Sequence, residues 1–130
     1  MKFNYVEITP QVARPLIAIK VSYKDKFLIT EALVDSGADY CVFPLEVAPV
    51  LGIPIEKAKR THLTGFLEGS TNLFLYPVKL AIDNHTVEVL AGFAQGMSMY
   101  APCTLGQQGF FDNFKICFDK SRLQLNIDPK

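Results

Sequence analysis

Short apolar stretches alternate with polar turns along the whole chain, which is the pattern of a β-rich protein. Residues 15–23 carry apolar side chains at every second position and predict a half-buried strand. The polar turn Lys24-Asp25-Lys26 separates this strand from the apolar residues 27–34. The two stretches are therefore predicted to form a β-hairpin.

Strands are also predicted on both sides of this hairpin. An opening strand over residues 3–8 ends before Pro10, a long hairpin joins residues 73–82 to 86–94, and a final hairpin joins residues 115–119 to 122–127. Residues 44–51 predict a short helical turn, which Gly52 ends. Many short strands separated by turns, with one small helix, predict an all-β protein whose sheet closes into a barrel.

Composition narrows the choice of partners. The chain has 130 residues, 49% of them apolar, which is enough for the core of one domain spanning residues 1–130. Its formal net charge is zero and it has no basic run, so nucleic acid is not an expected partner. No apolar stretch reaches the length of a membrane span, and the first residues lack the apolar core of a signal peptide. We therefore expect a soluble, cytoplasmic protein that does not bind membranes.

The three cysteines, Cys41, Cys103 and Cys117, are widely spaced and odd in number. They form no C-x-x-C pattern, and His62 and His85 add no spacing typical of a zinc site. We expect buried free thiols, no metal site and no cofactor.

The candidate chemistry lies in Asp35-Ser36-Gly37-Ala38, where the apolar residues 27–34 give way to a tight turn. A carboxylate after an apolar strand is costly to bury without hydrogen bonds or a group that shares its charge. Gly37 allows unusual backbone dihedral angles and the close approach of another segment. Because Asp, Ser and Gly all favour turns, an aspartate that caps its own loop is the simplest interpretation of these residues alone.

With its flanks, this segment resembles the catalytic loop of the single-domain retroviral-type aspartic proteases, the retropepsins. The flanks are Glu31-Ala32-Leu33-Val34 before it, and Asp39 and Val42-Phe43 after it. Two later segments are similar to the same family: residues 61–72, a glycine-punctuated hairpin at the place of the flap, and Leu105-Gly106, at the place of the hydrophobic-hydrophobic-glycine motif. The resemblance covers residues 16–127 and implies a closed acid-protease barrel with one short C-terminal helix.

The resemblance implies an aspartic endopeptidase, a hydrolase of peptide bonds, with Asp35 as the catalytic residue. Ser36 would form a hydrogen bond between subunits, and Ala38 would complete the active-site loop. The residues that would bind an extended polypeptide substrate are Gly37 and Asp39 on the loop, and Gly65, Phe66 and Leu67 in the flap.

Acid protease chemistry needs two carboxylates that share a proton. This chain has one Asp-Ser-Gly sequence. We therefore expect a symmetric homodimer in which Asp35 from each subunit meets at the two-fold axis and activates one water.

One position departs from the family pattern. Viral members follow the glycine of their motif with an arginine that pairs with the aspartate at the position of Asp39, and this chain has Gln107 there. The departure bears on the stability of the dimer. It also gives weight to a second hypothesis, a catalytically silent peptide-binding or scaffold module with the same fold. A third hypothesis, a metal-dependent hydrolase, has no ligand set in the sequence.

Overall fold

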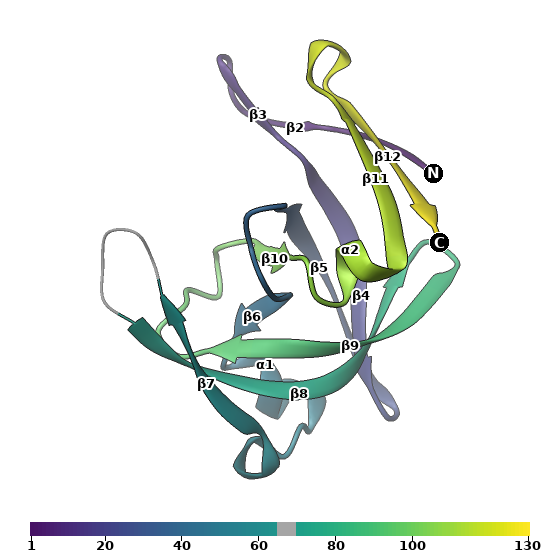
Figure 1. Ribbon diagram of the computed structural model, residues 1–130. Coiled ribbons are helices and arrows are strands. Elements are labelled where there is room, and N and C mark those ends of the chain that lie inside the picture. The colour runs from purple at the N-terminus through teal and green to yellow at the C-terminus, as the bar shows by residue number, and fades with distance from the viewer. Residues whose placement is uncertain (65–69) are drawn as a thin grey trace.

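The computed structural model describes residues 1–64 and 70–130 and is dominated by strands (Figure 1). The strands are β1 (Lys2–Asn4), β2 (Val6–Thr9), β3 (Val12–Arg14), β4 (Leu16–Tyr23), β5 (Lys26–Val34), β6 (Val42–Pro44), β7 (Lys59–Thr64), β8 (Ser70–Ile82), β9 (His85–Ala94), β10 (Cys103–Leu105), β11 (Phe114–Asp119) and β12 (Gln124–Pro129). The helices are α1 (Val47–Leu51) and α2 (Phe110–Asn113), and the short 3-10 helices are η1 (Ile55–Lys57) and η2 (Lys120–Arg122).

A closed ring of strands forms the body of the molecule. In the order β4-β5-β10-β6-β9-β8 each strand pairs with the next, and β8 returns to β4, where Leu80 lies opposite Val21. The pairings β5–β10 and β6–β9 are parallel, and the others in the ring are antiparallel. Strand β7 pairs with the first half of β8, outside the ring. The predicted closed barrel is confirmed, and closure leaves the ring without a free edge.

Alternation along the strands fills the barrel interior. On β4 the side chains of Ile17, Ile19 and Val21 are buried, as a period of two predicts. The rings of Phe43 and Phe93, both fully buried, stack with their centroids 5.8 Å apart. Burying one large apolar side chain contributes about 1.5–3 kcal/mol, so this interior is the main source of stability.

The helical turn predicted over residues 44–51 is confirmed as α1. Its residues Val47, Ala48 and Leu51 are buried in the main core. The helix ends at Gly52, whose φ of 73° lies in the left-handed region that glycine adopts without steric cost.

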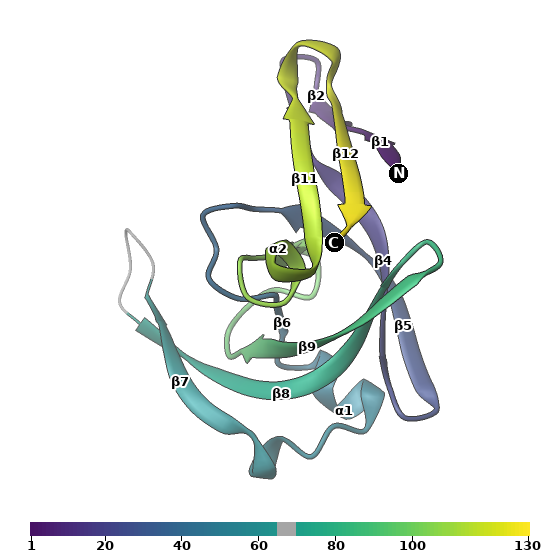
Figure 2. The same ribbon diagram turned by 45° about the vertical axis from the view of Figure 1, so that its right-hand side comes forward.

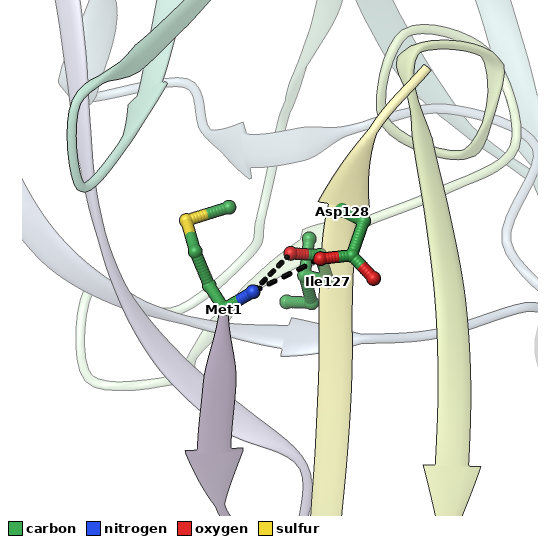
Figure 3. Close-up of polar contacts among 3 residues, drawn as sticks. All are labelled: Met1, Ile127 and Asp128. Atoms are coloured by element: carbon green, nitrogen blue, oxygen red, sulfur yellow. Dashed lines mark hydrogen bonds and ion pairs between the residues drawn. The ribbon is translucent and has the colours of Figure 1, made fainter.

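A second, three-stranded sheet joins β1, β12 and β11 in that order and is called the terminal sheet below. Figures 1 and 2 show its β11–β12 hairpin projecting from the barrel. The N-terminal ammonium donates a hydrogen bond to the Ile127 carbonyl (3.0 Å) and pairs with Asp128 Oδ1 (3.1 Å), as Figure 3 shows. The two ends of the chain are thus fastened together in one sheet.

The single opening strand predicted over residues 3–8 is wrong in its extent. The structure has two strands, β1 and β2, separated at Tyr5, whose backbone N–H donates to the Leu123 carbonyl (2.7 Å). The break lets β1 pair with β12 and β2 pair with β3. Local alternation does not locate such a break, because the pairing strand comes from the other end of the chain.

All three cysteines are free, but they differ in burial. Cys41 and Cys103 are buried in the barrel, as expected, whereas Cys117 is exposed on β11. The expectation of a buried thiol is wrong for Cys117 because it lies on the face of β11 opposite Phe114 and Ile116, which pack against the core. In the described part of the chain, no helix is long and apolar enough to span a membrane.

Candidate active site

The Asp35 loop, residues 35–39, leaves the barrel at the end of β5. Strand β5 runs parallel to β10, and their pairing ends with Val34 opposite Leu105. The next backbone N–H, that of Asp35, donates to the Leu105 carbonyl (3.0 Å). The pairing of β5 with β10 therefore fixes the backbone position of Asp35.

Two hydrogen bonds turn the loop back on Asp35. The Gly37 N–H donates to the carboxylate Oδ1 of Asp35 (2.9 Å), and the Ala38 N–H donates to the Asp35 carbonyl (3.2 Å). Asp35 is half-buried, and Ser36 and Gly37 are exposed. One carboxylate oxygen of Asp35 thus accepts a backbone hydrogen bond, and the turn at Ser36 and Gly37 is exposed to solvent.

The segment after β10 holds the other side of the loop. The backbone N–H groups of Gln107 and Gln108 donate to the carbonyls of Ala38 and Asp39, each at 2.8 Å. A Cβ at Gly106 would lie 2.3 Å from the Tyr40 carbonyl oxygen, closer than atoms of a real side chain come. Only glycine fits this approach. The Leu105-Gly106 segment therefore packs against the Asp35 loop.

The side chain of Gln107 does not pair with Asp39. Its Nε2 donates to the Ser36 carbonyl (2.7 Å). Asp39 is exposed, and it forms no ion pair within the residues that the structure describes. From the sequence alone, Gln107 was notable only because it replaces the arginine of the viral members. Its contact with Ser36 joins residues 71 positions apart, so no local sequence pattern predicts it.

The predicted hairpin over residues 61–72 agrees with the pairing of β7 with β8, in which Thr64 lies opposite Ser70. Gly65, Phe66 and Leu67, the expected substrate contacts of the flap, lie outside the described residues.

Cys41 is the nearest thiol to the loop, and it is a poor nucleophile. Its Sγ lies 3.7 Å from the Gln108 carbonyl. Burial raises the pKa of the Cys41 thiol, so the thiolate that acts as a nucleophile is disfavoured. The Asp35 carboxylate, and not the Cys41 thiol, is therefore the candidate reactive group of this region.

The described residues contain no group of three or more His, Cys, Asp or Glu side chains that could hold a metal ion. Two cavities in this part of the chain have volumes of about 340 Å³, beside Tyr23 and Tyr76, and about 250 Å³, beside Tyr5 and Val12. Neither is lined by residues of the Asp35 loop. Three residues of the loop, Ser36, Gly37 and Asp39, are exposed to solvent in the single chain.

The chain matches the model of a known protein family. The family model of the retroviral aspartyl proteases matches residues 11–105, which include β5, the Asp35 loop and β10. The chain therefore belongs to the retroviral aspartyl protease family.

Solved structures show the same fold. The EIAV protease complexed with the inhibitor HBY-793 is 18% identical, with a TM-score of 0.51, and the match covers 78% of this chain and 88% of that one. A retropepsin-like aspartic protease from Rickettsia conorii is 18% identical, with a TM-score of 0.57, and the match covers 86% of this chain and 80% of that one. The fold is retropepsin-like. No curated protein sequence matches the chain.

Proposed function

We propose that this chain is an aspartic endopeptidase that acts as a symmetric homodimer, with one Asp35 from each subunit. The proposal depends above all on the Asp35 loop, where a carboxylate at the end of a barrel strand accepts a hydrogen bond from the Gly37 N–H. Membership of the retroviral aspartyl protease family supports the same assignment.

The need for a second subunit follows from the chemistry. Two carboxylates must share a proton, and one chain brings a single Asp-Ser-Gly loop. That loop lies open, with Ser36 and Gly37 exposed. A two-fold axis beside the loop would bring the two Asp35 side chains together, and the Ser36 hydroxyls would hydrogen-bond across the interface.

In the dimer, one Asp35 carboxylate is ionised and takes a proton from a water molecule, whose oxygen attacks the carbonyl carbon of the scissile peptide bond. The other Asp35 is protonated and donates its proton to the carbonyl oxygen. Two close carboxylates cannot both ionise readily, so the pair keeps one proton between them and titrates as a unit.

The substrate is an extended polypeptide that binds as an added strand. Gly37 and Asp39 meet its backbone on one side. The hairpin of β7 and β8 covers it on the other, and Gly65, Phe66 and Leu67 are the substrate contacts that the family resemblance implies there.

The test is Asp35→Asn, which keeps the shape of the side chain and removes its charge. We expect cleavage of an unfolded protein at acidic pH to fall at least about a thousandfold, with the dimer and the fold unchanged. A statine inhibitor should block the wild-type protein. Asp83→Asn makes the same chemical change in the exposed turn between β8 and β9 and should leave cleavage as it is.

Three results would count against the proposal. Cleavage by the Asp35→Asn variant at the wild-type rate would show that another group catalyses the reaction. Sedimentation as a monomer, at concentrations where cleavage occurs, would exclude the shared site. Peptide binding without any cleavage would favour the second candidate, a scaffold module, to which Gln107 in place of the viral arginine gives weight.

A further inference from the structure

The Ser36–Gly37 peptide unit is held at both ends. Its carbonyl, on Ser36, accepts a hydrogen bond from Gln107 Nε2 (2.7 Å). Its N–H, on Gly37, donates to Asp35 Oδ1 (2.9 Å). A peptide unit is planar and rigid, so a group that fixes the carbonyl also fixes the direction of the N–H. Gln107 is thereby linked to Asp35 through one peptide.

From this geometry we infer that Gln107 is a positioning residue for the proposed protease: through the Ser36–Gly37 peptide it sets the orientation of the Asp35 carboxylate. The inference rests on the proposed function, because the orientation of Asp35 matters to catalysis only if Asp35 is catalytic.

The backbone of Gln107 is itself fixed, so its side chain starts from a defined place. Its N–H donates to the Ala38 carbonyl (2.8 Å), and its carbonyl accepts from the Asp112 N–H (3.2 Å). At the preceding residue, Gly106, an added Cβ would lie 2.7 Å from the Ala38 carbonyl oxygen and 2.3 Å from that of Tyr40, so the two backbones approach closely. The Gln107 side chain therefore reaches the Ser36 carbonyl from a fixed backbone position.

Gln107 is neutral, and this suits the role. An amide donor orients the peptide without adding charge. The glutamine then has a function of its own at this position, apart from the loss of an arginine.

Gln107→Leu and Gln107→Met both remove the amide donor at similar size without adding charge. Gln108→Leu is the matched control: Gln108 is the exposed neighbour, and its hydrogen bond to Asp39 comes from the backbone. The measurements are kcat and KM on a peptide substrate, sedimentation for the dimer, and the NMR resonance and hydrogen exchange of the Gly37 amide.

We expect both Gln107 variants to lower kcat about three- to tenfold, the value of one modest hydrogen bond, with KM and dimer affinity unchanged. The Gly37 amide proton should move upfield and exchange faster, since its acceptor is no longer held in line. Gln108→Leu should change neither kcat nor the Gly37 resonance.

Unchanged kcat with an unchanged Gly37 resonance in both Gln107 variants would overturn the inference. So would a lower activity explained entirely by a weaker dimer or a partly unfolded protein, because that result assigns Gln107 a structural role only. A wild-type protein that cleaves nothing would remove the proposed function instead. The Gly37 resonance would then decide by itself whether Gln107 controls the peptide.

Discussion

The barrel and the terminal sheet are built from the same kind of alternating strands, yet they complete their pairing differently. Every strand of the ring pairs on both sides. In the terminal sheet, as far as the structure describes the chain, β1 and β11 each pair with β12 alone. Phe93, inside the barrel, is fully buried, whereas Phe118, on the outer part of β11, is 40% exposed.

This difference shows where the free energy of folding is concentrated. A closed ring has no edge to leave open, and its interior excludes water from every inward side chain. The terminal sheet buries Phe114, Leu125 and Ile127 but exposes Phe118. An open edge also keeps unused hydrogen-bonding groups. Changes in the barrel should therefore cost much more than matched changes in the terminal sheet.

The largest expected effect is that of Phe93→Ala. Removing a fully buried ring leaves a cavity in the core, so we expect a loss of about 3–5 kcal/mol in the free energy of unfolding. Phe118→Ala, the matched change in the terminal sheet, should cost about 1 kcal/mol or less. Urea denaturation measures both. Equal losses would mean that the two sheets contribute alike.

The thiols give the next comparison. Burial raises the pKa of Cys103, on β10, to about 11, so at pH 8 its thiolate fraction is on the order of a hundredfold below that of an ordinary thiol. Iodoacetamide should modify Cys117, on β11, first, and Cys103 only after urea unfolds the protein. Mass spectrometry of digested samples identifies the modified residue, and Cys117→Ser should abolish the fast phase. Fast labelling of Cys103 in the native protein would contradict this description of the barrel.

A smaller loss is expected for Gly106→Ala, where the barrel meets the Asp35 loop. The added Cβ would collide with the Tyr40 and Ala38 carbonyl oxygens, and such overpacking costs about 1–3 kcal/mol. Gly37→Ala is the control for stability, since its Cβ would meet only Asp35 Oδ1, at 3.3 Å, and should cost less. Thermal and urea unfolding measure the stability of the two variants. A larger loss for Gly37→Ala than for Gly106→Ala would show that the backbone beside Gly106 shifts at little cost to admit a Cβ.

The smallest effect is expected for Asp128→Asn, which removes the ion pair with the N-terminal ammonium in the terminal sheet. The Asp128 side chain is 62% exposed, so the loss should be about 0.2–1 kcal/mol and should shrink as salt is added. Urea denaturation at low and high ionic strength checks this. A large loss in the free energy of unfolding that added salt does not reduce would mean that Asp128 stabilises the protein by more than this exposed ion pair.

Much of the barrel was predictable because each strand carries its own pattern. Alternation identified the β4–β5 hairpin, and the turn residues placed the hairpin of β8 and β9. The split of the opening strand at Tyr5 was not predictable, because its cause is a hydrogen bond to Leu123. The exposure of Cys117 was missed for a similar reason, since only the packing of the terminal sheet on the barrel decides which face of β11 is covered.

The candidate site divides in the same way. The segment Asp35-Ser36-Gly37-Ala38 and the Leu105-Gly106 motif were recognisable in the sequence. Their contacts were not, because the parallel pairing of β5 with β10 joins residues about seventy positions apart. That pairing alone puts Gln107 within reach of the Ser36 carbonyl.

The sequence by itself determined the β-rich class, the family and the identity of the one candidate carboxylate, because those depend on residue types and their order along the chain. Only the tertiary structure decided which distant segment packs against the Asp35 loop, which sheet stays open and which thiol is exposed. These depend on long-range strand pairing, whose hydrogen bonds have no local signal in the chain.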